Sequence, residues 1–94
     1  MDGDRPRLVF FHSRRSGTCR RTEAHLAQVL QRRRNHETFA VVPVAQEERP
    51  DLFERFRVTD VPTIVVVESA TLRTRVEKPR GTAEIEAALS RWLH

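Results

Sequence analysis

The side chains best suited to chemistry lie in one stretch, residues 12–25. This stretch contains Ser16 and Cys19, three positions apart, together with His12 and His25. A serine paired with a histidine can hydrolyse esters or amides, but the pair needs a carboxylate that orients the histidine, and no such acid is evident for Ser16 with His12 or His25. Cys19 is the only cysteine, which excludes an intramolecular disulfide and a metal site built from several cysteines.

Ser16 and Cys19 also have plain structural interpretations. A serine hydroxyl does not ionise usefully without a base, whereas serine is among the most favourable residues at the N-cap of a helix. A lone cysteine is often a small buried apolar residue. A metal site would have to combine His12, His25 and Cys19, and histidines in an arginine-rich segment are more typical of solvated side chains. The sequence therefore predicts no metal and no cofactor.

Four arginines bracket the same stretch: Arg14, Arg15, Arg20 and Arg21. They form either a solvated basic rim or a site for a carboxylate, a phosphate or a glutathione-like anion, because a helix N-terminus already attracts anions. Residues 1–35 hold nine arginines against three acids, and the whole chain has a net charge of +4. Aromatic residues are not interleaved with these arginines, which argues against a nucleic-acid surface.

Length and composition predict one domain over residues 1–94. The longest apolar run, Ile64 to Val67, is far too short to cross a bilayer, so we expect no membrane partner. Acidic residues near the N-terminus, with no apolar segment after them, indicate a cytoplasmic protein.

Hydropathy patterns predict four strands and three helices that would position these residues. β-branched and aromatic runs indicate strands, and the segment 18–34, without proline or glycine, has apolar residues at helical spacing. Pro50 is suited to the first position of a short helix, and Thr82 to the N-cap of a last helix that carries Trp92. The predicted strands are 7–12, 39–44, 63–68 and 72–77. We expect a mixed sheet in the order 39–44, 7–12, 63–68, 72–77, with the strand that contains Pro43 at an edge and helices on both faces.

The order β-α-β-α-β-β-α and several local motifs resemble the thioredoxin superfamily. An apolar strand, Leu8 to Phe11, leads into Ser16-Gly17-Thr18-Cys19 at the spacing at which thioredoxins carry Cys-Gly-Pro-Cys. The segment from Phe56 to Ile64 is similar to the family's approach to its cis-proline. The resemblance covers residues 5–94 and implies a thioredoxin-like α/β fold with a cis bond before Pro62.

The site departs from the family pattern at several positions. Ser16 stands where the family has its nucleophilic cysteine, Arg15 where it has tryptophan, Thr18 where it has proline, and Phe10 where it has a buried acid. Cys19 corresponds to the resolving cysteine, and it has no partner thiol. The resemblance therefore implies a degenerate redox site.

From these departures we predict a protein that lacks dithiol redox activity and binds a peptide or protein in a groove formed by Arg15, Ser16, Val61 and Pro62. One alternative is a one-cysteine oxidoreductase that uses Cys19 with an external thiol such as glutathione. A second alternative is a basic module for anions or nucleic acid that uses the four arginines named above.

Overall fold

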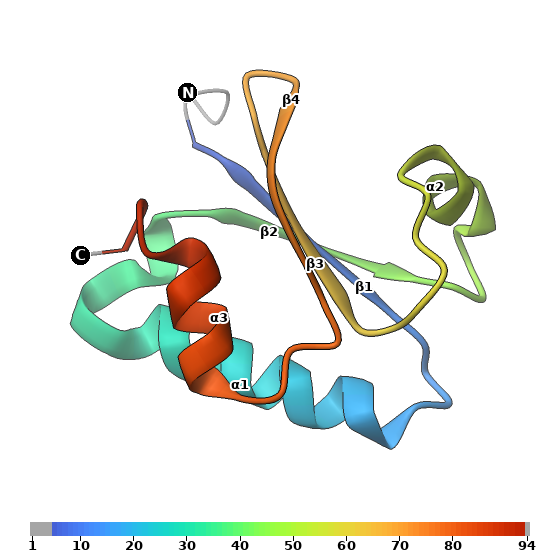
Figure 1. Ribbon diagram of the computed structural model, residues 1–94, viewed down its shortest axis with the longest axis horizontal. Helices are drawn as coiled ribbons and strands as arrows, with labels where there is room; N and C mark the ends of the chain where they lie inside the picture. The colour runs from blue at the N-terminus through green and yellow to red at the C-terminus, as the bar shows by residue number, and fades with distance from the viewer. Residues whose placement is uncertain (1–4, 94) are drawn as a thin grey trace.

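The computed structural model describes residues 5–93, except for the side chains of Arg33, Arg34 and His36. The described chain forms four strands and three helices, with a 3₁₀ segment, η2, after the first helix. Figure 1 shows their arrangement. The elements are β1 (Arg7–His12), α1 (Gly17–Gln31), η2 (Arg32–Glu37), β2 (Ala40–Ala45), α2 (Pro50–Arg55), β3 (Thr63–Glu68), β4 (Thr71–Glu77) and α3 (Thr82–Leu89). Within the described residues, no helix is long and apolar enough to cross a membrane.

The four strands form one mixed sheet in the order β2-β1-β3-β4, which confirms the predicted order. β1 runs parallel to β2 and antiparallel to β3, and β4 is antiparallel to β3. The central strand β3 is buried on both faces, as its continuous β-branched run requires: Ile64, Val65 and Val66 are fully buried. Pro43 lies on the edge strand β2, where its missing N–H removes no bond from the interior of the sheet.

The two faces of the sheet are covered unequally. On one face, alternate strand residues such as Phe10 and Ile64 pack under α1 and α3, with Leu26 and Ile85 contributed by the helices. On the other face, Phe11 and its strand neighbours pack against the short helix α2 and the segment that follows it. Figure 1 shows α2 standing apart from the pair α1 and α3.

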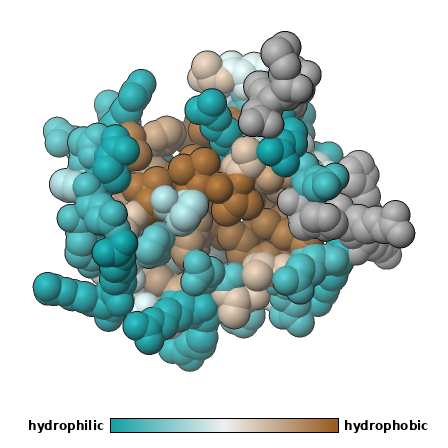
Figure 2. All heavy atoms as spheres, turned by 180° about the vertical axis from the view of Figure 1, so that it is seen from behind, coloured by the Kyte–Doolittle hydropathy of each residue, from teal (hydrophilic) through white to brown (hydrophobic). Residues whose placement is uncertain are grey.

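The face with α2 leaves an apolar groove of about 490 Å³, whose walls include Val9, Val44 and Leu52. Val41, Val42 and Leu72 are the large apolar side chains that stay 40–46% exposed among the described residues. Figure 2 shows apolar side chains gathered in the middle of one face of the molecule. The short helix is therefore too small to cover its side of the sheet.

The first helix ends earlier than predicted. The pattern indicated a helix to residue 34, whereas α1 ends at Gln31 and the chain tightens into η2. The side-chain amide of Asn35, which is buried, donates a hydrogen bond of 2.7 Å to the carbonyl of Arg32. A side chain that satisfies a backbone carbonyl at a helix end competes with continued α-helix, which explains the early end.

The strand β4 does not alternate as a simple pattern would require. A bulge lies opposite Val66 and Val67, so that Val66 pairs with Thr74 and Val67 pairs with Leu72. The extra residue reverses the side-chain alternation, because a strand has a period of two. Val76 accordingly packs under α1 and α3, whereas Leu72 lines the groove on the opposite face.

Trp92 was predicted to lie on the last helix with its ring on the sheet. α3 ends at Leu89, and Trp92 lies half-buried in the turn beyond it, edge-on to Phe39 with the ring centroids 5.8 Å apart. The ring contacts the margin of the core, and the guanidinium of Arg91 lies 5.2 Å above it. The loss of stability expected for Trp92→Ala therefore falls below the ~3–5 kcal/mol of a fully buried ring, and chemical denaturation can measure it.

The turn between β3 and β4 offers a prediction on stability. Ser69 and Ala70 both have positive φ, 52° and 62°, and they form a two-residue hairpin turn of the kind that favours glycine. Ala70→Gly removes the clash of Cβ with its own backbone and is expected to raise the free energy of unfolding by about 0.5–1 kcal/mol. The matched control, Ala83→Gly on the exposed side of α3, is expected to lower it by a similar amount. Urea denaturation of both variants checks the opposite signs, and a loss in Ala70→Gly contradicts the argument.

Candidate functional site

The N-terminus of α1 begins at a serine that caps it. Ser16 has extended backbone angles, φ −103° and ψ 116°, and its Oγ accepts a hydrogen bond of 3.2 Å from the backbone N–H of Cys19. This arrangement satisfies one of the free N–H groups at a helix start. The predicted N-cap is confirmed, and the side chain at the position of the family's nucleophile is a half-buried hydroxyl.

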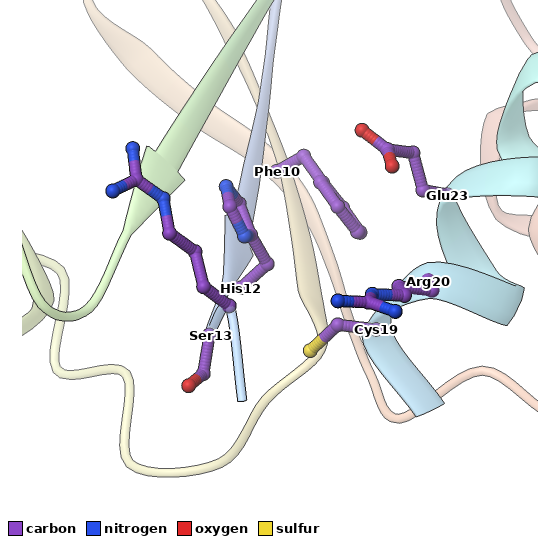
Figure 3. Close-up of a pocket in the computed structure, with 7 residues that line it drawn as sticks. Phe10, His12, Ser13, Cys19, Arg20 and Glu23 are labelled. Carbon is purple, nitrogen blue, oxygen red and sulfur yellow. The ribbon is translucent and has the colours of Figure 1, made fainter. Parts of the chain in front are cut away.

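Cys19 lies one turn into α1 and points into the protein. It is a free thiol and only 3% exposed. Its side chain lines a cavity of about 260 Å³ together with Phe10, His12 and Arg20, and Figure 3 shows these residues around it. Phe10 and His12 stack with ring centroids 5.4 Å apart, so an aromatic ring stands where the resemblance places a buried acid. The acid that lines this cavity is Glu23, which lies on α1 one turn after Cys19 and not at the position of Phe10.

A residue from a distant turn fixes the loop before α1. The hydroxyl of Ser13 donates to Oε2 of Glu47 at 2.5 Å, and the backbone N–H of Arg14 donates to Oε1 at 3.3 Å. The Ser13 carbonyl in turn accepts from the N–H of Ser16 at 3.2 Å. This role of Glu47 could not be predicted, because the residue lies in a polar turn between β2 and α2 that shows no periodic pattern.

The Ser13 bond has a consequence for pH. The hydroxyl of Ser13, with smaller help from nearby N–H groups and Arg15, holds the pKa of Glu47 below its ordinary value. A carboxyl group with a lowered folded-state pKa stabilises the fold above its unfolded-state pKa, and this contribution is lost as the pH falls through the folded-state pKa. We expect Ser13→Ala to raise the pKa of Glu47 toward its ordinary value, as measured by a carbon-13 NMR titration of its carboxyl carbon. Equal midpoints in the two proteins contradict the assignment.

The second half of the site is the turn before β3. Phe11 on β1 pairs with Thr63 on β3, so the loop that leaves β1 and the turn that enters β3 lie at the same end of the sheet. The Val61–Pro62 peptide bond is cis. The hydroxyl of Thr63 donates to the carbonyl of Asp60 at 2.7 Å, which closes the turn.

Val61 has an unused backbone. Among residues 5–93, no backbone hydrogen bond uses its N–H or its C=O, whereas the next carbonyl, that of Pro62, accepts from the N–H of Lys78 at 2.7 Å. The Val61 side chain is half-buried and Pro62 is buried. A backbone N–H and C=O that are free on one residue can pair with an extended chain.

Of the four arginines considered either as a basic rim or as an anion site, two line one cavity and the other two do not. Arg14 forms an ion pair with Glu48, and Arg15 is exposed. Arg14 and Arg20 both line the cavity of Cys19, whereas Arg21 lines a different cavity on the other side of α1. Successive helical residues point about 100° apart, which explains why neighbours in the sequence face separate cavities.

The histidines are also separated. His12 shares the cavity of Cys19, and His25 lines the cavity of Arg21. Within the described part of the chain, no three His, Cys, Asp or Glu side chains come together in a way that could hold a metal ion. The combination of His12, His25 and Cys19 is therefore not assembled.

Comparisons with known proteins agree with this architecture. The sequence model of the family described as Thioredoxin matches residues 1–91. The chain therefore belongs to the thioredoxin family. A search of curated proteins found no match.

Solved thioredoxin structures share the fold at low sequence identity. Oxidised mitochondrial thioredoxin 3 of Saccharomyces cerevisiae is 19% identical and superposes with a TM-score of 0.79, covering 96% of this chain and 81% of its own. Trxlp of Edwardsiella tarda is 15% identical with a TM-score of 0.82, over 99% of this chain and 86% of its own. Thioredoxin of Fasciola hepatica is 16% identical with a TM-score of 0.79, over 95% and 82%. The predicted thioredoxin-like fold is confirmed.

Proposed function

We propose that this member of the thioredoxin family lacks dithiol redox activity and binds an extended segment of a peptide or protein partner. The observation that carries the proposal is the pairing of a hydroxyl at the start of α1 with a single, buried thiol. Ser16 caps the helix, and Cys19, the only cysteine of the chain, is 3% exposed.

Thiol–disulfide exchange requires more than this site offers. A thiolate must attack one sulfur of the substrate disulfide, and a second thiol must then release the reduced substrate from the mixed disulfide. Ser16 supplies no thiolate, and Cys19 has no second thiol in the chain. The reaction therefore lacks both its first and its last step within this protein.

The proposed groove of Arg15, Ser16, Val61 and Pro62 can bind a peptide without reacting with it. The free N–H and C=O of Val61 can pair with an extended backbone. We place the groove between Val61 and Ser16, both half-buried, because the turn before β3 and the loop after β1 lie at the same end of the sheet. Arg15 is exposed at the start of α1 and adds a positive charge there. A small number of backbone bonds plus one apolar contact predicts weak, sequence-tolerant binding.

Two measurements test the proposal. The first is the reduction of insulin disulfides with dithiothreitol as the electron source, in which the protein is expected to give the rate of buffer alone. The second is a nitrogen-15 NMR titration with S-alkylated insulin B chain, an extended peptide without free thiols. Saturating shifts are expected at Ser16 and Val61, and none at the distant turn of Ser69 and Ala70.

Two matched variants separate groove binding from general stickiness. Val61→Asp introduces a charge into the groove and is expected to abolish the shifts. Leu72→Asp introduces the same charge at the other end of the sheet, where Leu72 pairs with Val67 at a 46% exposed position, and is expected to leave the shifts unchanged. Reduction of insulin at a rate well above that of buffer contradicts the proposed loss of redox activity. An equal loss of the peptide-induced shifts in both variants contradicts binding in the groove.

Cys19 in reaction with glutathione disulfide is the second candidate, supported by the cavity that reaches its side chain beside Arg20. The Cys19 thiolate would attack one glutathione sulfur, form a mixed disulfide and release glutathione thiolate. Mass spectrometry of the folded protein after exposure to glutathione disulfide decides between the candidates. Rapid addition of one glutathione favours this function, and addition only in denaturant favours the binding role.

We also propose a cytoplasmic location, supported by the single cysteine, because small secreted domains are commonly rich in disulfides. The nucleic-acid alternative has a direct test in the salt dependence of DNA and RNA binding. We expect no affinity beyond the general attraction of a chain with a net charge of +4.

A further inference from the structure

A concave site lies between α1 and the connection from β4 to α3, on the side of α1 away from the cavity of Cys19. Figure 1 shows this connection passing beside the helix. The cavity has a volume of about 360 Å³. α1 supplies Thr18, Arg21, Thr22 and His25, and the connection supplies Lys78 and Arg80.

The charge of this cavity is one-sided. Three of its lining residues are permanent cations, and none is an acid. Among residues 5–93, no carboxylate lies within ion-pair distance of Arg21 or Arg80. Lys78 lies 3.6 Å from Asp60, but both side chains are at least half exposed, so this pair neutralises little of its charge. The lining of the cavity therefore carries three positive charges, and the acid beside it is Glu84, whose carboxylate accepts from the backbone N–H of Arg80.

The hydroxyl of Thr22 is a further donor at this cavity. Thr22 is only 2% exposed and lines the cavity. Nevertheless, no hydrogen bond joins its hydroxyl to any other group in the described residues. No side-chain nitrogen or oxygen among the described residues is both fully buried and without a partner, so this hydroxyl keeps contact with solvent and is available to donate to a ligand in the cavity.

The walls hold these groups in place before any ligand arrives. Lys78 adopts a left-handed backbone conformation with φ 48°, and its N–H donates to the carbonyl of Pro62. The N–H of Arg80 donates to Oε2 of Glu84 at 3.1 Å, and the intervening Pro79 is buried. A non-glycine residue at positive φ is costly and is found more often where function requires it.

We propose that this cavity binds an oxyanion, the phosphate or carboxylate group of a ligand. Such a group accepts several hydrogen bonds at once, and the cavity offers two guanidinium forks, an ammonium and two hydroxyls as donors. The volume accommodates one such group with its first substituent. The site differs from the peptide groove of the proposed function in its residues and in its ligand, so each can fail without the other.

The test is an NMR titration of the full chain at constant ionic strength, with inorganic phosphate in one arm and glutarate in the other. The amides of Thr18 and Thr22 and the side-chain Nε–H groups of Arg21 and Arg80 are followed. Saturating shifts at these groups are expected in at least one arm. A stronger response to phosphate assigns a phosphorylated ligand, and a stronger response to glutarate assigns a carboxylate. Shifts that never saturate, or that spread over the whole surface, overturn the site.

Matched variants distinguish a built site from general charge. Arg21→Ala and Arg80→Ala are each expected to weaken binding about tenfold or more, since charge-assisted hydrogen bonds are lost. Arg20→Ala removes the same charge from the neighbouring position of α1, outside this cavity, and is expected to change the affinity less than twofold. Equal weakening in all three variants overturns the proposal.

A variant at Thr22 tests the site without changing the net charge of the protein. Thr22→Val keeps the size of the side chain and removes its hydroxyl. Because the hydroxyl has no partner inside the protein, this variant is expected to keep or raise its melting temperature while it binds the anion several-fold more weakly. A variant that loses stability but retains full affinity shows that the hydroxyl serves the fold and contradicts its role as a ligand donor.

Discussion

The Ser16→Cys variant is expected to form a disulfide with Cys19 and to reduce insulin disulfides at a rate well above that of the natural chain. The substitution places a sulfur at position 16, the N-cap of α1, where backbone N–H groups and the helix dipole lower the pKa of a thiol. A fall from about 8.5 to about 7 would raise the thiolate fraction at pH 7 from about 3% to about half. Residues three apart at a helix start lie within reach of a disulfide.

Two controls make the Ser16→Cys experiment decisive. Ser16→Ala removes the cap and adds no thiol, so it is expected to stay inactive and to lose about 1 kcal/mol of stability. Ser16→Cys combined with Cys19→Ser has the exposed thiol without the second one, and it is expected to stop at the mixed disulfide. A disulfide that forms without activity shifts the explanation to Arg15, Thr18 and Phe10. No disulfide under mild oxidation contradicts the geometry described for the site.

The Phe11→Ala variant is expected to lose about 3–5 kcal/mol of the free energy of unfolding. Phe11 is fully buried on β1, edge-on to Phe53 at 5.0 Å and tilted to Phe56 at 5.4 Å between ring centroids. It is the largest fully buried side chain among the described residues, and it joins the sheet to α2 and the segment after it. Alanine would leave a cavity that a small domain cannot close without moving that helix.

Urea denaturation measures this loss, with Leu72→Ala as the control. Leu72 is 46% exposed at the rim of the same face, so its truncation is expected to cost less than about 1 kcal/mol. Because domains of this size are only marginally stable, Phe11→Ala is also expected to be partly unfolded at 37 °C. Similar losses in the two variants contradict the division of this face into a core and an open groove.

The fold could be predicted from the sequence where one local pattern had only one structural solution. The continuous β-branched run from Ile64 to Val67 had to be a central strand, and Pro43 required an edge. The end of α1 could not be predicted in the same way, because it depends on the hydrogen bond from Asn35 rather than on a helix-breaking residue. The bulge in β4 could not be predicted either, because the alternation of polar and apolar residues along the sequence does not reveal how the strand pairs with β3.

The candidate site likewise contains features that local sequence predicts and features that depend on distant residues. Ser16 as an N-cap followed from residue type and position. The role of Glu47 did not, because its bond to Ser13 spans 34 positions of the chain. The cationic cavity was also missed, since Arg21 and Arg80 meet only when the connection from β4 to α3 folds back along α1. Long-range pairs of polar groups leave no periodic signal in a single sequence.

The unequal cover of the sheet sets how the molecule opens. Within residues 5–93, the six-residue helix α2 is the only helix on its face of the sheet, and an apolar groove separates part of it from the strands. Helices α1 and α3 pack together on the other face. Local opening therefore needs the least free energy on the α2 side of the sheet. The backbone amide hydrogens of α2 should exchange with solvent before those of β1, β3 and α1. The turn that carries Val61 follows α2 along the chain. The Val61 side of the proposed peptide groove can therefore move when the α2 layer opens. The Ser16 side stays in place, because it belongs to the capped start of α1 in the more stable layer.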